Sequence, residues 1–423
     1  MKARPNSVFL IPSNSEVVRN SDVHYLFRQE SHFRYLCGLE EPDAFLVLAP
    51  SKSLAGAFRT ILFIRTKDVE KEMWQGERYG VEGALEIFGA NEAYPIEELD
   101  KRLPELFSGA DRVFYRLGVD PKCDARVIRA LDANRASSGR SGKGLLPIED
   151  AQTVIGEMRL YKAPEEIELH RKACQITAAA HKSVMKEVKP GMGEHEIEAL
   201  IDYLFRKNGC DRVAYPTIAA GGKNATCLHY QHNNCVLKDG ELLLIDAGGE
   251  YQCYAADITR TYPIGRDFTK AQANLYDLTL KSQKEAVAMT KPGVKLADIH
   301  KHVYEVLTEG LLSLGLLQGN RDEIIKNLGF KRFFPHNTSH WMGLDVHDAG
   351  LYFQNGEPRT LEPGMFFSVE PGLYVQPNDK DAPASFRNIG IRIEDDILVT
   401  QTGCENLTKD APKEREEIVA LRS

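Results

Sequence analysis

The C-terminal half of the chain repeats one order of landmarks twice, and this repeat constrains the fold more than any other feature. Each copy has a Lys-Pro-Gly helix break, an aromatic residue followed by proline, and a turn glycine before an apolar run that ends in an acid. These landmarks are residues 189–191, Tyr215-Pro216, Gly240 and Asp246 in the first copy, and residues 291–293, Phe334-Pro335, Gly364 and Glu370 in the second. A duplication of this kind places equivalent residues around a pseudo-twofold axis.

A second acid follows in each copy, Asp257 in the first and Glu394 in the second. The duplication therefore predicts that four carboxylates converge on one point. Converging anions repel one another unless a cation lies among them. The pattern indicates a metal site, and four negative charges would balance two divalent ions.

The helix and strand signals around the acids also occur twice. A helix is expected to begin at Pro164, where proline and the acids after it suit a first turn, and to break at 190–191. Further helices are expected at 194–207, 271–289 and 296–316. Helix, break, helix and strands, in that order and twice over, predict a sheet that is covered by paired helices.

The first pair of acids lies on two expected antiparallel strands, residues 242–246 and 257–262. Residues opposite each other on such strands have Cβ atoms about 5 Å apart. Opposite positions would bring Asp246 and Asp257 close enough to share ions. On its own, this spacing of acids is also compatible with a surface or helix-capping role.

Residues 1–155 are expected to form a separate α/β domain that shapes or assembles the protein. Apolar runs predict strands, helical periodicity alternates with them, and a Ser/Gly-rich stretch predicts an exposed loop. The predicted strands are 44–49, 60–64 and 112–117, the predicted helices are 81–88, 96–107 and 125–131, and the predicted loop is 137–144. Residues 156–423 are expected to form the second domain.

The composition narrows the classes of partner and compartment. Net charge is −8 over 423 residues, which argues against nucleic acid as the main partner. The eight cysteines form no Cys-x-x-Cys pair, as is typical of reduced thiols in a reducing compartment. The sequence has no signal-peptide or membrane-span pattern, so we expect a cytoplasmic location and no membrane partner.

Histidines and an arginine lie near the acids. Three of the twelve histidines, His336, His340 and His347, fall within twelve residues, and His229 precedes the first acid. A single histidine is more often a core residue, and Glu394 beside Arg392 could be an ordinary ion pair on one strand face. Taken together, the acids and His340 form an oxygen-rich donor set that favours manganese, or other harder divalent ions, over a thiolate-type zinc site.

At this point the sequence resembles a known family, the bacterial-type aminopeptidase P or Xaa-Pro aminopeptidase group of the pita-bread metallopeptidases. The resemblance covers nearly the whole chain and includes N-terminal stretches at 25–42 and 74–80. Its catalytic motifs are Ile245-Asp246-Ala247-Gly248, Asp257-Ile258-Thr259-Arg260-Thr261, Ser339-His340-Trp341-Met342-Gly343, Val369-Glu370-Pro371-Gly372 and Arg392-Ile393-Glu394-Asp395. Five motifs in family order make this resemblance highly specific.

The resemblance implies an α/β N-terminal domain followed by an α+β pita-bread (creatinase/aminopeptidase) catalytic domain with internal pseudo-twofold duplication. It implies two divalent metal ions, usually manganese, with Asp257 and Glu394 bridging, Asp246 on one ion, and His340 with Glu370 on the other. His229, His347 and Arg392 would be catalytic or substrate-orienting residues, and His336 would be a pocket residue. The chain departs from the family pattern at Asn337-Thr338, which bears on substrate preference.

The implied reaction removes the N-terminal residue of peptides that have proline second, using a hydroxide that bridges the metals. Proline nitrogen carries no hydrogen and its ring fixes φ, so a pocket with ring-shaped apolar walls, including Tyr374, could select it. Glu370 would pass the proton of the attacking water to the leaving nitrogen.

Two alternatives remain open: a prolidase that acts on Xaa-Pro dipeptides and, more distantly, a metal-free peptide- or protein-binding module. Relatives often form dimers or tetramers, so we also expect a homo-oligomer. Trp74 either reaches a neighbouring subunit's active site or packs locally.

Overall fold

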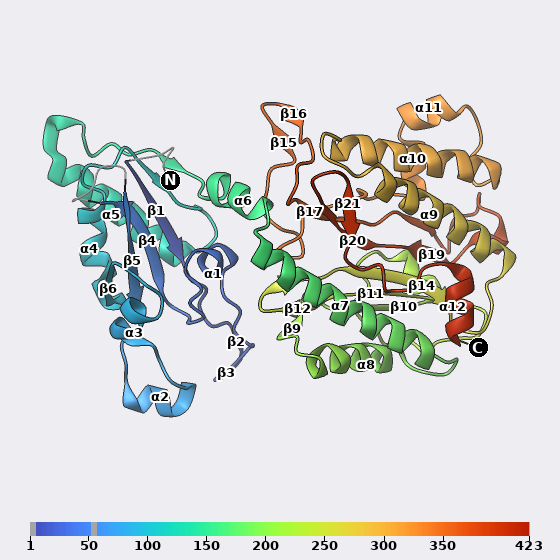
Figure 1. Cartoon of the computed structure of the whole chain (residues 1–423), viewed down its shortest axis with the longest axis horizontal. Helices are drawn as coiled ribbons and strands as arrows, with labels where there is room; N and C mark the ends of the chain where they lie inside the picture. Colours follow the sequence, from blue (N-terminus) through green and yellow to red (C-terminus); the bar gives the residue numbers. More distant parts are fainter. Residues whose placement is uncertain (1–5, 52–56, 423) are drawn as a thin grey trace. The chain divides into compact units, whose positions relative to one another are not determined.

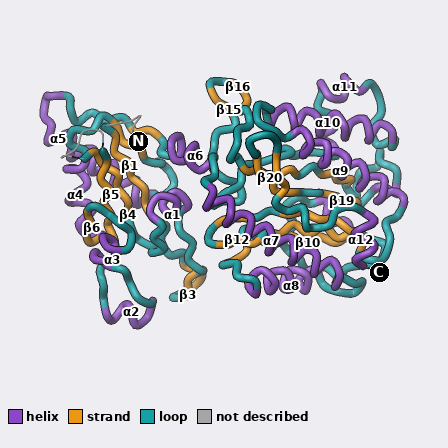
Figure 2. Tube along the Cα trace, viewed as in Figure 1, coloured by secondary structure: helices purple, strands orange, loops and turns teal. Residues whose placement is uncertain are grey.

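The computed structural model describes residues 6–51 and 57–422, which belong to two compact units, Met1–Met158 and Arg159–Ser423. Each unit is described by itself. Helices and strands alternate in the first unit, whereas the second surrounds its strands with long helices (Figures 1 and 2). No helix among the described residues is long and apolar enough to span a membrane.

The first unit is built on a six-stranded mixed sheet with the order β6-β5-β4-β1-β7-β8. Strand β1 pairs antiparallel with β4 and parallel with β7, so two directions of strand meet at its centre. The strands are β1 (Ser7–Pro12), β4 (Phe45–Pro50), β5 (Phe58–Ile64), β6 (Glu92–Pro95), β7 (Arg112–Phe114) and β8 (Ile148–Glu149); a small hairpin, β2 (Val18–Asn20) and β3 (Val23–His24), lies outside the sheet.

Helices cover both faces of this sheet, and the period of two along the strands explains why. In β1, Val8 and Leu10 belong to one apolar cluster, with residues of α4 and α5, while Phe9 and Ile11 belong to another, with residues of α1 and α3. The helices are α1 (Ser31–Cys37), α2 (Val69–Gln75), α3 (Gly80–Glu86), α4 (Leu99–Leu106) and α5 (Pro121–Ser138), followed by α6 (Gln152–Leu160). A sheet buried on both faces is the α/β arrangement expected from the sequence.

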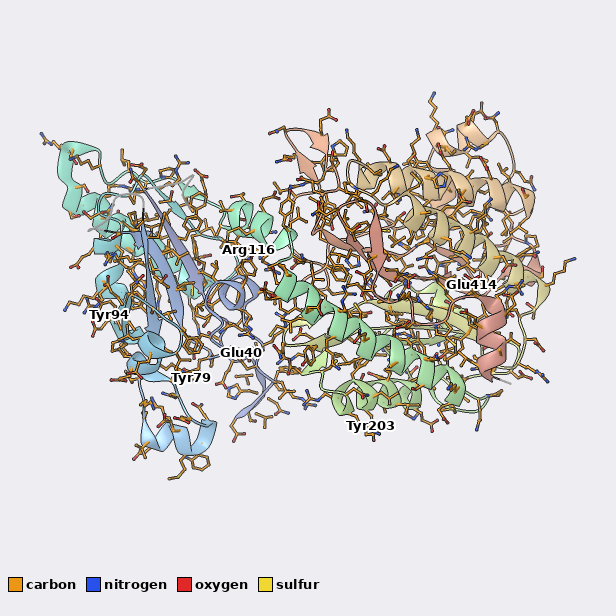
Figure 3. The ribbon with its side chains drawn as sticks, viewed as in Figure 1. Glu40, Tyr79, Tyr94, Arg116, Tyr203 and Glu414 are labelled. Atoms are coloured by element: carbon orange, nitrogen blue, oxygen red, sulfur yellow. The ribbon has the colours of Figure 1, made fainter. Side chains whose placement is uncertain are left out.

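Two helix pairs frame the second unit. Helices α7 (Pro164–Glu187) and α8 (Glu194–Lys207) contact each other, as do α9 (Lys270–Met289) and α10 (Leu296–Ser313). Glu166 accepts the Ala163 N–H at 2.8 Å and so caps the start of α7, and Thr269 with Gln272 caps α9. The outer face of α8 carries Tyr203, which is exposed (Figure 3). The helix breaks predicted at the two Pro-Gly sequences are confirmed.

Antiparallel strands from both copies lie between the helix pairs (Figure 1). The first copy contributes β9 (Arg212–Val213), β10 (Ile218–Gly221), β11 (Leu242–Ala247), β12 (Gly249–Tyr251), β13 (Tyr254–Ala255) and β14 (Ile258–Pro263). The second contributes β17 (Phe366–Val369), β18 (Gly372–Val375), β19 (Ile389–Arg392), β20 (Asp395–Val399) and β21 (Cys404–Asn406). A short helix α11 (Arg321–Lys326), a hairpin of β15 (Phe353–Gln354) and β16 (Glu357–Pro358), and α12 (Arg415–Arg422) complete the unit.

Candidate metal centre

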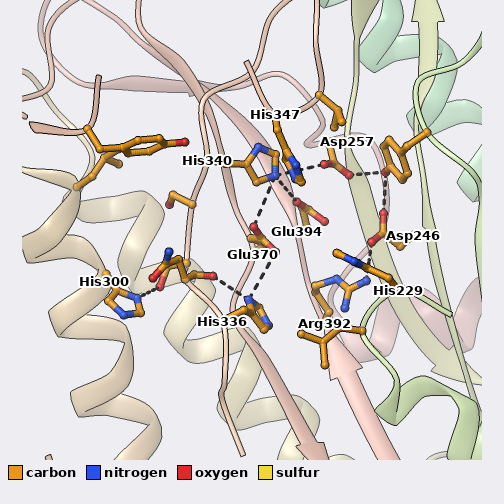
Figure 4. A pocket seen from close by; sticks show the side chains of 18 of the residues that line it. His229, Asp246, Asp257, His300, His336, His340, His347, Glu370, Arg392 and Glu394 are labelled. Atoms are coloured by element: carbon orange, nitrogen blue, oxygen red, sulfur yellow. Dashed lines mark hydrogen bonds and ion pairs between the residues drawn. The ribbon is translucent and has the colours of Figure 1, made fainter. Parts of the chain in front are cut away.

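The five predicted ligands come from both halves of the second unit and line one cavity of about 1110 Å³. Asp246 lies on β11 and Asp257 directly precedes β14. Glu370 lies between β17 and β18, and Glu394 lies between β19 and β20. His340 is on a loop that a Trp341–Phe367 bridge ties to β17. Figure 4 shows these side chains directed towards one another.

His340 is at the centre of the group. Its Nε2 atom lies 3.5 Å from an oxygen of Asp257, 3.6 Å from one of Glu370 and 3.9 Å from one of Glu394. Ligand atoms of Asp257, His340 and Glu394 lie within 4.8 Å of one another, a spacing at which they could share a metal ion. The structure therefore brings four of the predicted ligands into direct proximity.

The strand register makes one pair of acids diagonal neighbours and the other pair directly opposite. Asp246 is opposite Thr259, so Asp257 is its diagonal neighbour and the expectation of directly opposite acids is wrong by two residues. Such diagonal neighbours are separated by about 7–8 Å. In the second copy the pairings Val369–Asp395 and Gly372–Arg392 share one register, which places Glu370 opposite Glu394. The duplication is not exact at the site.

Tyr215 spans the wider gap in the first copy. Its hydroxyl lies 2.7 Å from an oxygen of Asp246 and also contacts an oxygen of Asp257. Burial raises the pKa of Tyr215 well above its usual value, and the nearby carboxylates add to this, so the phenol stays protonated. The second copy has Phe334 at the aligned landmark and lacks this hydroxyl.

Arg392 connects the acids to a second group of side chains. Its guanidinium forms an ion pair with Asp246, donates to Thr259 Oγ1 at 3.1 Å and donates to the Tyr374 hydroxyl at 2.8 Å. That hydroxyl lies 2.9 Å from His336 Nε2. Because the other ring nitrogen of His336 lies 2.8 Å from the Asn337 carbonyl, which only accepts, Nδ1 carries the proton and Nε2 accepts from Tyr374.

The position of Tyr374 corrects one expectation. Its ring is 1% exposed and is not among the residues that line the cavity, so it does not form a wall that substrate could touch. Burial raises the pKa of its hydroxyl to about 12, despite the cation of Arg392. Tyr374 therefore acts on the cavity through the two residues it holds, His336 and Arg392, which do line it.

The electrostatics of the acids are those expected of a site that binds cations. Burial raises the pKa of Glu394 well above its usual value, that of Glu370 to about 7 and that of Asp257, and neighbouring carboxylates contribute in each case. Burial opposes ionisation of Asp246 too, but Arg392 holds its pKa below the usual range. Three crowded carboxyls that resist ionisation, beside an imidazole, are the donor set that bound divalent cations would stabilise.

The remaining predicted residues lie around the same cavity. His347 packs edge-on against His340 with ring centroids 4.3 Å apart, and burial with nearby histidines lowers its pKa. His229 lines the cavity and is exposed. In Figure 4 both histidines lie close to the acids: His347 is beside His340, and His229 is beside Arg392.

Three site residues were not found from the sequence. Tyr215 was noted only as a landmark of the repeat, and its contrast with Phe334 was the available signal. Thr259 donates to Glu394 at 2.6 Å, and strand alternation from Asp257 places it on the same face. His300 of α10 lies 2.8 Å from the Thr338 hydroxyl and lines the cavity, but no local pattern pointed to it.

Comparisons with known proteins identify relatives of both units. The profile of the aminopeptidase P N-terminal domain matches residues 1–115, and that of metallopeptidase family M24 matches residues 168–401. The chain is 42% identical over 418 residues to the Xaa-Pro aminopeptidase of Escherichia coli, covering 99% of this chain and 94% of that protein. It is 36% identical to human Xaa-Pro aminopeptidase 3, covering 98% of this chain and 80% of that protein.

Solved structures agree with these sequence matches. A Pseudomonas aeruginosa aminopeptidase superposes with a TM-score of 0.94 at 41% identity, covering 99% of this chain and 94% of that one. A zinc-substituted Escherichia coli aminopeptidase P in complex with product superposes with a TM-score of 0.93 at 42% identity, with the same coverage. These matches confirm the expected α/β domain followed by a duplicated α+β pita-bread domain.

Proposed function

Because this chain belongs to metallopeptidase family M24, we infer that it is a metal-dependent Xaa-Pro aminopeptidase, which releases the N-terminal residue from peptides with proline second. The observation that carries this inference is the convergence of four carboxylates and one imidazole, drawn from both copies of the repeat, in one cavity. The relatives named above have the same activity in their names and match over almost the full chain.

We propose that the centre holds two divalent ions and that they are manganese. Asp257 and Glu394 would bridge the ions, Asp246 would hold one of them, and His340 with Glu370 would hold the other. The donor set contains oxygens and one imidazole, and the described residues that line the cavity include no cysteine. Such ions, when bound, polarise a carbonyl and lower the pKa of a water molecule.

Glu370 is the residue placed to move a proton. It is buried enough for its pKa to rise to about 7, and it lies within 4 Å of both His340 and His336. A carboxyl that titrates near neutral pH can take a proton and return it within one turnover. His229 and His347, both on the cavity wall, would orient the scissile carbonyl.

The cavity has a volume of about 1110 Å³, which leaves room for more than a dipeptide and favours an aminopeptidase over a prolidase. Figure 4 places His300 on the opposite side of Glu370 from Asp257. The same cavity is also lined by Leu296, Leu351 and Phe353, of which Phe353 is 62% exposed and so lies at the rim. We propose that peptide residues after the proline lie along this rim.

Product analysis with two substrates tests the function. With manganese added, we expect Arg-Pro-Pro to give free arginine and Pro-Pro, and a bare Arg-Pro dipeptide to be a much poorer substrate. A chelator should stop the reaction, and added manganese should restore it. Faster cleavage of the dipeptide would identify a prolidase, and no cleavage of either peptide by metal-loaded protein would overturn the proposal.

We further propose a cytoplasmic homo-oligomer, a dimer or tetramer, in which Trp74 contacts a second copy. The Trp74 side chain is 87% exposed, so it is not packed within its own unit. Val69 and Met73 on the same short helix are also 80% exposed. If Trp74→Ala left both the solution mass and the kinetics unchanged, this part of the proposal would fail.

A further inference from the structure

Helix α7 carries a stripe of four buried polar side chains, His170, Cys174, Thr177 and His181, which we call the α7 stripe. Their spacing of four, three and four residues places them on one face of the helix. All four side chains are at most 1% exposed. Polar groups buried to this extent are unfavourable unless they hydrogen-bond, so their partners indicate their purpose.

The two ends of the stripe bind the chain beside the two acids of the first copy. His181 Nε2 lies 3.0 Å from the carbonyl of Ala247, the residue after Asp246. His170 Nδ1 lies 3.0 Å from the carbonyl of Ala255, two residues before Asp257. A carbonyl only accepts, so both nitrogens carry protons. Burial lowers the pKa of His170 to about 3 and that of His181 to about 4, so both rings are neutral donors.

Of the two middle residues, Thr177 binds the segment between the acids directly, and Cys174 acts on it through Asp396. Thr177 Oγ1 accepts the N–H of Gly249 at 3.0 Å. Cys174 Sγ donates to Asp396 Oδ2 at 3.3 Å, and the same oxygen accepts the N–H of Asp257 at 2.9 Å. Helix α7 therefore holds the chain between Asp246 and Asp257 directly at three points and at a fourth through Asp396, and Figure 1 shows α7 running beside this connection.

We propose that the α7 stripe consists of positioning residues that set the separation of Asp246 and Asp257 and thereby the affinity of the site for divalent cations. This rests on the proposed assignment of those acids as ligands. The strand register alone leaves the acids diagonal and well apart. Apolar side chains could fill the same volume, but they would leave the Ala247 and Ala255 carbonyls and the Gly249 N–H without these partners.

The test measures manganese affinity rather than turnover. Full-length protein is stripped with a chelator and titrated with Mn²⁺ by calorimetry, and its thermal midpoint is recorded without metal. His181→Leu should weaken Mn²⁺ binding by about tenfold or more, the range for outer-shell partners of metal ligands. His181→Gln, which keeps a donor near the Nε2 position, should restore most of that affinity.

A milder pair of substitutions and a matched control distinguish weaker metal binding from a general loss of stability. Thr177→Val removes the acceptor for Gly249 with little change in volume, while Thr177→Ser keeps it, so only the valine variant should bind Mn²⁺ more weakly. Val184→Ala creates a cavity on α7 within the apolar core and should lower the thermal midpoint without changing Mn²⁺ affinity.

The outcomes separate this inference from the proposed function. If the wild-type protein binds no Mn²⁺, the proposed metal centre is wrong. If it binds Mn²⁺ but His181→Leu and Thr177→Val bind within twofold of wild type, the centre stands and the positioning role is overturned. The positioning role would also be overturned if Val184→Ala weakened Mn²⁺ binding as much as the stripe variants do while having a similar thermal midpoint.

Discussion

Glu370 is the residue for which we propose two roles, metal ligand and proton carrier. It faces Glu394 across the strand pair, and its carboxylate lies 3.6 Å from His340 and 3.7 Å from His336. Burial raises its pKa to about 7, and the nearby His340 and Arg392 cations only partly offset this. An acid poised in this way is sensitive to replacement by its amide, which has nearly the same shape.

Glu370→Gln should therefore retain the fold and lose most activity. An amide cannot carry the proton, and general acid–base catalysis typically contributes about 10²–10⁴-fold to the rate. The measurement is kcat on a Xaa-Pro tripeptide, with thermal unfolding to confirm the fold. Glu357→Gln, at an exposed glutamate of β16, is the matched control and should keep normal kcat. Wild-type turnover in Glu370→Gln would remove the assigned role.

At the scale of elements, the connection between β11 and β14 is the tightest part of the site. Gly248 follows the strand that carries Asp246, and a Cβ atom built there would lie 1.7 Å from the Ala256 carbonyl oxygen. No side chain fits in that space without moving the backbone that leads to Asp257. The glycine is thus required by a close approach of two chain segments.

Gly248→Ala should displace the connection between β11 and β14. We expect a lower thermal midpoint without metal and weaker Mn²⁺ binding, because strain at a packed backbone contact is among the larger causes of destabilisation. Gly403→Ala is the control, since nothing lies within 4 Å of a Cβ placed there. The thermal midpoint and calorimetric titration of the two variants give the comparison, and equal values for both would show that the connection tolerates a side chain.

The sequence predicts some helices and strands more accurately than others. Helices α8 and α9 are found within one residue because Pro-Gly breaks and capping residues are local signals. Helix α5 runs to Ser138, beyond the predicted end. Strand β1 was not predicted, because its short apolar run is buried on both faces and so shows no alternation of apolar and polar residues. The register around Asp246 and the burial of Tyr374 depend on partners far along the chain, which no local pattern encodes.

At the scale of the whole molecule, the metal centre is a large concentration of like charge that folding must bury. Without a cation, its carboxyls and His340 depend on protons for compensation. Burial opposes the charge on His340, but Asp257 and Glu370 raise its pKa to about 9. The stability of the metal-free protein should therefore depend on pH through this site.

The sign of that dependence follows from the direction of the shifts. The pKa of His340 is raised from 6.5, so its stabilising contribution is complete below pH 6.5 and is lost as pH rises through about 9. Glu370 is raised from 4.5 to about 7, so protonation also favours the folded state and its contribution decreases as pH rises to about 7. We expect a lower thermal midpoint at pH 9 than at pH 7 for protein in chelator.

Two comparisons isolate the site in this experiment. Saturating Mn²⁺ should raise the midpoint and reduce its pH dependence, because bound cations replace the protons. In chelator, His340→Asn should show a smaller change between the two pH values than the wild type. A midpoint of metal-free protein that is unchanged or higher at pH 9 would contradict the assigned shifts.

The unequal halves of the site also bear on how such a centre can arise. Two identical subunits meeting on a twofold axis must supply identical groups, so every change appears twice. Here His340 comes only from the second copy. The hydroxyl of Tyr215 comes only from the first copy, because its counterpart in the second copy is Phe334. Joining the copies in one polypeptide frees each half to change independently, so that each can contribute different groups to the same cavity.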